Sequence, residues 1–298
     1  MAKQTIVAAV KAGRILVSDG AWGTFLQKKG MQPGECPELW CVSHRDAVMD
    51  IAKGYIAAGS DMIETDSFGG TRCKLAHFGL AARTVELNTA AAAISREAAG
   101  PDKWVIASVG PTGLMTAMGD VTEDDFYAFF KEQVMALEAG GADAICIETM
   151  SALDECTAAI RAVRENTHCE VICTLTYERT IQGTYRTMMG VSPSEAALAT
   201  VEAGAHVIGT NCGNGMERML DIVKELKQAA PTTPIMVQAN AGLPKNVNGL
   251  DVFPETPADM AGRVAELVAA GAVIIGGCCG TTPAHIAALK QAVNKLNV

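Results

Sequence analysis

Eight short apolar segments alternate along the chain with longer segments of helical periodicity, and this alternation limits the possible folds more than any other feature. The apolar segments have the length of strands and are rich in β-branched residues, as strands buried on both faces of a sheet are. They span residues 14–19, 61–65, 104–109, 143–148, 170–176, 205–210, 234–239 and 272–277. The helical segments span residues 45–59, 82–100, 123–141, 152–167, 193–204, 216–230, 257–271 and 283–296. Strict alternation of this kind predicts a parallel sheet covered by helices.

An internal repeat marks the junctions between helices and strands. Four segments, IAAGSDMIET, LEAGGADAICIET, VEAGAHVIGT and VAAGAVIIGG, run from a helix end through Ala-Gly into a strand. The glycine suits the position after a helix, where the backbone often adopts a positive φ. Eight strand–helix units favour a closed (β/α)8 TIM barrel over the alternative, an open sheet of eight strands. No linker or change in composition interrupts the pattern, so residues 1–298 are expected to form a single barrel domain.

The charge balance argues against a nucleic-acid partner. Among 298 residues, 24 Lys and Arg stand against 33 Asp and Glu, which gives a formal net charge of −9. The basic residues are not clustered, so no surface is expected to neutralise a phosphate backbone. The chain also has no run of 18 apolar residues and no export-signal pattern near its start. We therefore expect a cytoplasmic protein that binds neither nucleic acid nor a membrane.

Polar residues and cysteines stand where several of the predicted strands end. They are Asp19 after the first strand, Glu148 at the end of the fourth, Asn211 and Cys212 after the sixth, and Cys278 and Cys279 after the eighth. In parallel barrels the loops that follow the strands meet at one rim, where active sites are built. These side chains are therefore predicted to lie at the same end of the barrel.

The ten cysteines fall into two groups. In a chain without an export signal they indicate reduced thiols or metal binding rather than a disulfide framework. Cys146 and Cys173 lie inside predicted strands, where a small buried hydrophobic side chain is the expected role. The cysteines at the strand ends are the candidates for chemistry.

The adjacent pair Cys278 and Cys279 is unusual, because neighbouring residues of a regular strand point to opposite faces. Glycines flank the pair on both sides (GGCCG), so the backbone can turn there and direct both thiols to one point. Cys212, which also follows a strand and precedes a glycine, can supply a third thiol. Three thiolates suit Zn²⁺ and leave one coordination position open, as in catalytic zinc sites. The residues alone also allow two other interpretations, small side chains packed in a tight turn or a redox switch.

At these residues the sequence resembles the homocysteine S-methyltransferase family, most closely the homocysteine-binding module of cobalamin-dependent methionine synthase. The resemblance rests on the motifs SDGAWGTFLQ, IETDSFGGT, GPTG, IETMSALDE, TNCGNG, NAGLP and GGCCGTTPAHI, which span nearly the whole chain. It implies that Cys212, Cys278 and Cys279 bind zinc, and that Asp19 and Glu148 hold the amino group of homocysteine.

The resemblance also implies a site for the substrate carboxylate in the segment after the second strand. Ser67 and Phe68 are expected to bind it through backbone N–H groups, and Asn211 of the TNCGNG motif is a further substrate-binding candidate. The segment departs from the family at Asp66 and Ser67, where Asn and Thr are usual. An acid at position 66 would repel a carboxylate unless it points away.

The expected reaction is methyl transfer to the thiol of homocysteine, which gives methionine. The resemblance favours a methylated corrinoid as donor, either free methylcobalamin or one carried by a separate corrinoid protein. The chain ends after the barrel, without a corrinoid-binding domain, and Gly280 stands where the S-methylmethionine-using branch commonly has Arg.

Other functions remain open at this point. S-methylmethionine or betaine are alternative donors, and another thiol is an alternative acceptor. A zinc-binding or redox-sensing barrel without enzymatic activity is a further possibility. A lyase or aldolase of the Schiff-base type is disfavoured, because no Lys stands at a predicted strand end.

Overall fold

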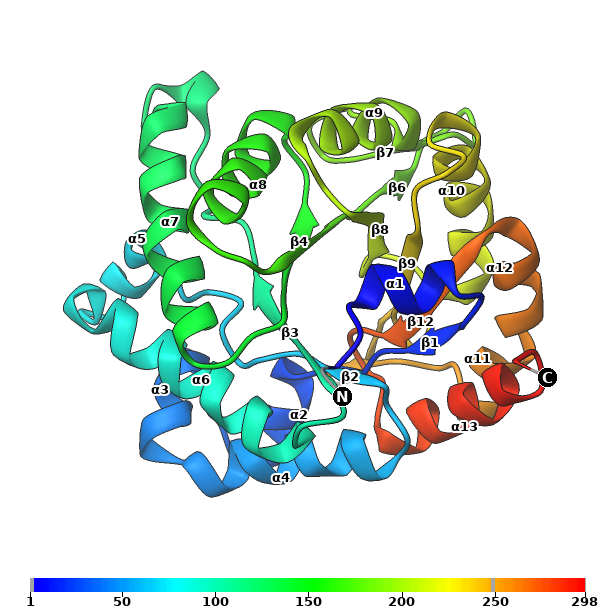
Figure 1. The fold of residues 1–298 in the computed structure, drawn as a ribbon, viewed down its shortest axis with the longest axis horizontal. Helices are drawn as coiled ribbons and strands as arrows, with labels where there is room; N and C mark the ends of the chain where they lie inside the picture. The colour runs from blue at the N-terminus through cyan, green and yellow to red at the C-terminus, as the bar shows by residue number, and fades with distance from the viewer. Residues whose placement is uncertain (1–2, 248–249, 298) are drawn as a thin grey trace.

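Eight parallel strands form a nearly closed barrel with helices around it, which confirms the predicted (β/α)8 TIM barrel (Figure 1). The computed structural model describes residues 3–247 and 250–297, so residues 1, 2, 248, 249 and 298 of the predicted domain lie outside the described residues. The barrel strands are β1 (Leu16–Val17), β2 (Met62–Ile63), β3 (Trp104–Val109), β4 (Ala144–Met150), β5 (Glu170–Leu175), β8 (Val207–Asn211), β9 (Ile235–Ala239) and β12 (Ala272–Gly277). Their order in the sheet is β1-β12-β9-β8-β5-β4-β3-β2.

The two ends of the sheet meet at a seam between β1 and β2. These strands have two residues each, fewer than the segments 14–19 and 61–65 predicted. Across the seam the Asp61 N–H donates to the Val17 carbonyl at 2.8 Å, and the Val17 N–H donates to the Asp61 carboxylate at 2.9 Å. A carboxylate therefore takes the place of a backbone acceptor where the barrel closes.

The helices that connect the barrel strands pack around the outside of the sheet. They are α4 (Arg45–Ala57), α6 (Thr84–Ala99), α7 (Glu123–Ala139), α8 (Leu153–Asn166), α9 (Pro193–Ala203), α10 (Met216–Ala229), α11 (Pro257–Gly262), α12 (Val264–Ala270) and α13 (Pro283–Asn294). The segment predicted as one helix over 257–271 is divided at Arg263, directly after Gly262, a residue type that weakens helix interiors. Within the described ranges, no helix has both the length and the apolar character needed to cross a membrane.

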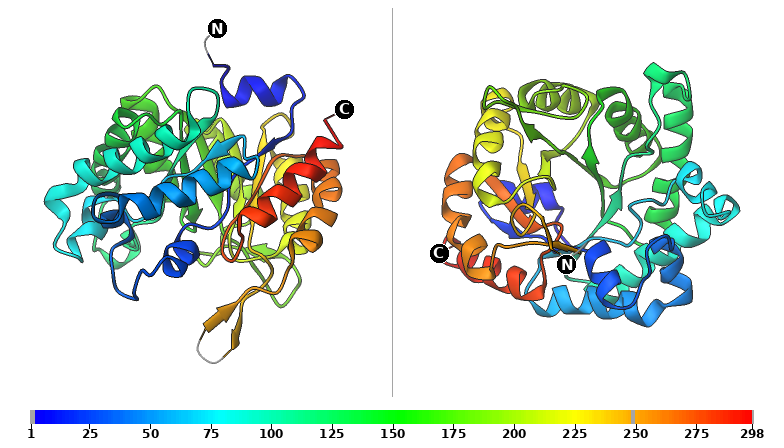
Figure 2. Two further views of the ribbon diagram at one scale, coloured as in Figure 1. Left: turned by 90° about the horizontal axis from the view of Figure 1, so that it is seen from below. Right: turned by 180° about the vertical axis from the view of Figure 1, so that it is seen from behind.

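A short helix with no counterpart among the predicted elements, α1 (Ile6–Lys11), covers the amino-terminal end of the barrel. Its buried residues Ile6 and Val10 pack against the side chains that fill the barrel. The N–H groups of Ile6 and Val7 donate to the carboxylate of Glu170, at 2.6 and 3.0 Å. Figure 2 shows α1 at one end of the molecule and a hairpin of β10 (Lys245–Val247) and β11 (Leu250–Val252) at the other. Helix α1 thus closes the end of the barrel that lies opposite the strand-following loops.

The loops that follow the strands contain further short elements. They are α2 (Gly23–Lys28) and α3 (Pro37–Ser43) after β1, α5 (Arg72–Ala76) and η1 (Ala81–Arg83) after β2, η2 (Thr116–Met118) after β3, and a hairpin of β6 (Glu178–Arg179) and β7 (Tyr185–Arg186) after β5. With the β10–β11 hairpin, these insertions surround the carboxyl-terminal rim and build walls above it.

Candidate active site

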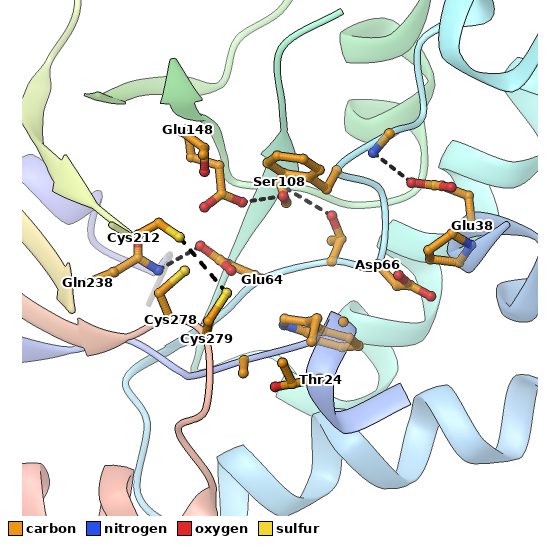
Figure 3. A pocket seen from close by; sticks show the side chains of 18 of the residues that line it. Thr24, Glu38, Glu64, Asp66, Ser108, Glu148, Cys212, Gln238, Cys278 and Cys279 are labelled. Carbon is orange, nitrogen blue, oxygen red and sulfur yellow. Dashed lines mark hydrogen bonds between the residues drawn. The ribbon is translucent and has the colours of Figure 1, made fainter. Parts of the chain in front are cut away.

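The three strand-end cysteines lie together at the carboxyl-terminal rim (Figure 3). The sulfur atoms of Cys212, Cys278 and Cys279 all lie within 4.8 Å of one another, and those of Cys212 and Cys279 are 3.9 Å apart. All three side chains are half-buried, whereas Cys146 and Cys173 are fully buried in the core, as predicted. Among the described residues, these three cysteines form the group whose ligand atoms could hold one metal ion.

Backbone conformation explains how adjacent cysteines come to face one point. After β12, the Cys278 N–H still donates to Ala239 of the neighbouring strand, at 2.8 Å, but Gly280 then turns the chain with a φ of +80°. Cys212 has a φ of +56°, a left-handed conformation that is rare for a residue with a Cβ. Strain of this kind persists only where surrounding structure holds it, and it is concentrated at functional sites.

The thiols interact with one another strongly enough to change their acidity. Hydrogen bonds from Cys278 and Cys279 stabilise the Cys212 thiolate and lower its pKa far below the usual range of a thiol. The same interactions, together with burial, raise the pKa of the other two thiols. Of the three thiols, the hydrogen bonds therefore favour ionisation at Cys212.

The cysteines line one side of a cavity of about 460 Å³. Figure 3 shows Glu64, Glu148 and Gln238 beside the sulfur atoms, and Glu38 and Asp66 further along the cavity. Trp22, Phe68, Lys74 and His77 also line it. The cavity thus has one end built from thiols and acids on the barrel strands, and another built from the insertions after β1 and β2.

Glu148 lines the cavity, and polar groups of two other barrel strands hold its carboxylate. The Ser108 hydroxyl of β3 donates to one oxygen, and the Asn211 amide of β8 donates to the other at 3.1 Å. Burial raises the pKa of Glu148 to about 7. Asn211 also accepts from the Thr149 N–H at 2.8 Å, so the structure makes it a support for Glu148 rather than part of the cavity wall.

Asp19 is fully buried and lies behind the residues that line the cavity. Its carboxylate accepts from the Trp22 indole N–H and from the Glu64 backbone N–H, both at 2.9 Å. Burial raises its pKa to about 6. Of these two predicted substrate-binding acids, Glu148 lines the cavity and Asp19 does not.

Two polar residues of the cavity wall, Glu64 and Gln238, are absent from the set of candidates taken from the sequence. Glu64 follows β2 directly, and Gln238 lies in β9. The Gln238 amide N–H donates to Glu64 at 2.7 Å. Burial and repulsion from Glu148 and Asp19 raise the pKa of Glu64 well above its usual value. Each residue lies near the end of a predicted apolar strand. A polar residue at that position was the sequence signal that could have identified it.

The segment predicted to bind a carboxylate has a mixed arrangement. The Ser67 N–H donates to Thr65 and its hydroxyl donates to Ser108, so Ser67 faces away from the cavity. Phe68 lines the cavity and is 39% exposed. Asp66 also lines it, and burial together with the Glu38 carboxylate raises the pKa of Asp66 well above normal.

The chain matches the family model described as homocysteine S-methyltransferase over residues 16–293. It is 33% identical over 304 residues to a methionine synthase of Mycobacterium tuberculosis, an alignment that covers 95% of this chain and 25% of that protein. A methionine synthase of Mycobacterium leprae is 32% identical over 306 residues, with coverage of 96% and 25%. The chain thus spans about a quarter of the length of these relatives.

Among solved structures, the fold is similar to the metallated form of the homocysteine methyltransferase MmuM from Escherichia coli. The TM-score is 0.78 at 25% sequence identity, and the match covers 95% of this chain and 98% of that one. Nearly the whole chain therefore has a counterpart in the fold of that protein.

Proposed function

Because this chain belongs to the homocysteine S-methyltransferase family, we propose that it transfers a methyl group from a methylated corrinoid to the thiol of homocysteine, giving methionine. Cys212, Cys278 and Cys279 would bind Zn²⁺ at the wall of the cavity. The observation that carries the proposal is the meeting of three cysteine sulfurs with buried acids in one cavity.

The cysteine cluster fits a zinc ion in chemistry and in size. Zinc prefers tetrahedral coordination by thiolates at about 2.3 Å, which places sulfur ligands about 3.8 Å from each other. The sulfurs of Cys212 and Cys279 are 3.9 Å apart, and the third lies within 4.8 Å of both. Half-burial leaves the cluster open to the cavity, so a fourth ligand can come from the substrate.

Different residues would bind the ammonium group and the sulfur atom of homocysteine. The buried acids beside the cysteines receive the ammonium group, which directs the substrate sulfur to the cysteine cluster. Zinc held by three thiolates would lower the pKa of the substrate thiol and keep its sulfur nucleophilic. The thiol proton leaves to solvent, the sulfur lone pair forms the new bond to the methyl carbon, and the bond between that carbon and the donor breaks.

Two features support a corrinoid donor. Large apolar side chains are exposed on the loops around the cavity mouth, which suits a bulky or protein-borne donor. They include Met115, Met118, Ile181, Met188 and Leu243. In addition, a Cβ at Gly280 would lie 2.2 Å from the Phe253 ring, so the Arg of the S-methylmethionine branch has no room at this position.

A small-molecule donor is the second candidate. The homocysteine methyltransferase MmuM is matched over 98% of its length by this chain. A barrel of this size can therefore be a methyltransferase by itself, and S-methylmethionine and betaine belong in the assay beside methylcobalamin.

The test combines zinc content with methionine formation from homocysteine. We expect about one zinc per wild-type chain, and we expect the Cys278→Ala variant to lose both zinc and activity. Cys73→Ala is the matched control, because Cys73 is also half-buried but belongs to α5, outside the cluster. Absence of zinc from freshly reduced wild type would overturn the zinc site. Bound zinc without methionine from any of the three donors would overturn the reaction.

A further inference from the structure

Hydrogen bonds on two sides hold the main chain of the turn that carries Cys278 and Cys279. On the side of β9, the Cys278 N–H donates to the Ala239 carbonyl at 2.8 Å, and the Ala241 N–H donates to the Cys279 carbonyl at 3.0 Å. On the other side, Thr281 donates twice to the Cys278 carbonyl, from its N–H at 3.1 Å and from its hydroxyl at 2.7 Å. Of these bonds, the one from the Thr281 hydroxyl is made by a side chain.

The same hydroxyl also binds the segment that follows β1. The Thr281 oxygen accepts from the Ala21 N–H at 3.0 Å, and Ala21 lines the cavity. The Ala21 carbonyl in turn accepts from the Tyr55 hydroxyl of α4 at 2.7 Å. Because β1 and β12 are paired in the barrel, the Thr281 hydroxyl joins the cysteine turn after one strand to the cavity wall after its neighbour.

Two glycines leave the room that the Thr281 side chain occupies. A Cβ at Gly20 would lie 2.6 Å from the Thr281 hydroxyl oxygen, and a Cβ at Gly277 would lie 2.4 Å from it. Neither glycine has a positive φ, so backbone conformation does not require glycine at these positions. The close approach of the Thr281 hydroxyl accounts for both. The segments after β1 and at the end of β12 are thus shaped around one buried oxygen atom.

Thr281 acts on the site through other residues. Its side chain is 2% exposed and is not part of the cavity wall, so it does not face a substrate. Without the hydroxyl, the buried Ala21 N–H would lose its acceptor, and the Cys278 carbonyl would keep the longer of its two bonds to Thr281. An unpaired buried N–H is costly, so the turn or the Ala21 segment should move to relieve it. Either movement would turn the Cys278 sulfur away from the other two.

We propose that Thr281 is a positioning residue of the zinc site. Its hydroxyl fixes the cysteine turn against the cavity wall, so that the sulfurs of Cys212, Cys278 and Cys279 face one point and zinc binding requires little movement of the backbone. The inference rests on the proposed function for the zinc ion, and it extends the site to a residue that does not touch the metal. Hydrogen bonds that orient the ligands of a metal are typically worth about 10- to 100-fold in metal affinity.

The experiment measures the Kd for zinc by competition with a chromophoric chelator on reduced protein. The Thr281→Val variant keeps the size of the side chain and removes the hydroxyl, so its Kd should rise about 10-fold or more. The Thr281→Ser variant keeps the hydroxyl and removes a methyl group, and its Kd should stay near the wild-type value. A role in packing alone predicts the opposite order, because Val retains the methyl group that Ser lacks.

Thr282→Val is the matched control. Thr282 is the next residue, and its hydroxyl contacts the His285 ring at 2.9 Å at the start of α13 rather than the cysteine turn. Loss of this N-cap contact should lower the free energy of unfolding of the metal-free protein and leave the zinc Kd unchanged. If Thr281→Val does not fold, the Gly20→Ala variant carries the test, because its Cβ would displace the Thr281 hydroxyl from the opposite segment. Its zinc Kd should also rise.

The possible outcomes separate this inference from the proposed function. An unchanged Kd in the folded Thr281→Val variant, a larger rise in Thr281→Ser than in Thr281→Val, or an equal rise in Thr282→Val would overturn the inference alone. A wild type that binds no zinc would overturn the zinc site and this inference with it. Zinc affinities in the expected order, without methionine formation from any of the three donors, would count against the proposed reaction alone.

Discussion

The two ends of the barrel bury acids in opposite ways. At the end covered by α1, Asp61 lies between basic side chains, with the Lys290 ammonium 2.7 and 2.8 Å from its two oxygens. Asp143, also at this end, pairs with Lys3 and Arg96. At the cavity end, the acids accept hydrogen bonds from neutral donors such as Ser108, Trp22 and Gln238.

The difference separates acids that have a counter-ion within the chain from acids that the proposed ligand would neutralise. Acids at the α1 end have their counter-ions within the chain, so they contribute to the free energy of folding whether or not a ligand is present. Acids at the cavity end lack an internal counter-ion within the described residues and remain costly until a cation binds. The predictions below test this division from the largest expected effect to the smallest.

The largest effect is expected from Glu148→Gln, at the cavity end. The change keeps the shape of the side chain and one acceptor oxygen for Ser108 or Asn211, but removes the charge that would face the proposed ammonium group. The kcat/KM for homocysteine should fall about 100- to 1000-fold, which corresponds to about 3–4 kcal/mol. Zinc content should stay at the wild-type level, and the free energy of unfolding should not decrease. An activity within threefold of wild type would contradict the role of this acid.

The Asp61→Asn variant tests the opposite end. Loss of the charge leaves Lys290 without its partner and weakens the seam between β1 and β2, so the free energy of unfolding should fall by about 2–4 kcal/mol. The kcat/KM of the folded protein should stay within twofold. Glu86→Gln, which breaks an exposed pair with Arg83, should change the free energy of unfolding much less in the same denaturant titration. Loss of activity without loss of stability in Asp61→Asn would contradict the assignment of Asp61 to the stability of the fold.

The pH dependence of the free energy of unfolding should show that ionised acids at the cavity end destabilise the fold. The pKa of Asp19 is about 6 in the folded protein and 3.8 in a model peptide. Because the folded value is raised, the stabilising contribution of this group is complete below about pH 4 and is lost as pH rises through about 6. A shift of two pKa units corresponds to about 3 kcal/mol.

The measurement compares wild type with Asp19→Asn in metal-free, reduced protein. The lowered pKa of Cys212 makes its own contribution run in the opposite direction, so the difference between the two proteins isolates Asp19. Between pH 4 and 8 the difference in unfolding free energy should shift in favour of Asp19→Asn by about 2–3 kcal/mol. A shift in favour of wild type would show that Asp19 has a cationic partner.

The smallest effect is expected from Ser108→Ala. This change removes the hydroxyl that donates to Glu148 but leaves the Asn211 donor. The KM for homocysteine should rise about 3- to 10-fold with kcat nearly unchanged. This rise corresponds to a loss of about 1 kcal/mol of binding free energy. Ser60→Ala, a buried serine before β2 at the other end, should leave the KM unchanged. A larger rise in KM for Ser60→Ala than for Ser108→Ala would contradict the contrast between the two ends of the barrel.

The barrel could be predicted from sequence because its signals are local. Each strand is a short buried segment, and each connecting helix has its own periodicity, so all eight units could be found without knowledge of their neighbours. The extents of β1 and β2 could not, because pairing across the seam depends on the Asp61 side chain and not on the apolar pattern. Helix α1 was missed for a similar reason, since it is stabilised by Glu170, distant in sequence.

The candidate site was predictable only in part. The position of residues after strands placed the three cysteines and Glu148 at one rim. Whether a side chain at that rim reaches the cavity or lies behind it depends on the stagger of the strands, which no local pattern reports. Asp19 and Glu64 both stand at strand ends, yet Glu64 lines the cavity and Asp19 supports it from behind.

The contact between Gly280 and Phe253 also limits how this barrel can change over generations. Any Cβ at position 280 would lie 2.2 Å from the Phe253 ring, and the φ of +80° adds strain of its own. A side chain at position 280 therefore requires Phe253 to move or to be replaced by a smaller residue. Positions 253 and 280 should therefore covary among descendants of this barrel. A residue larger than Gly at position 280 is expected together with a residue smaller than Phe at position 253.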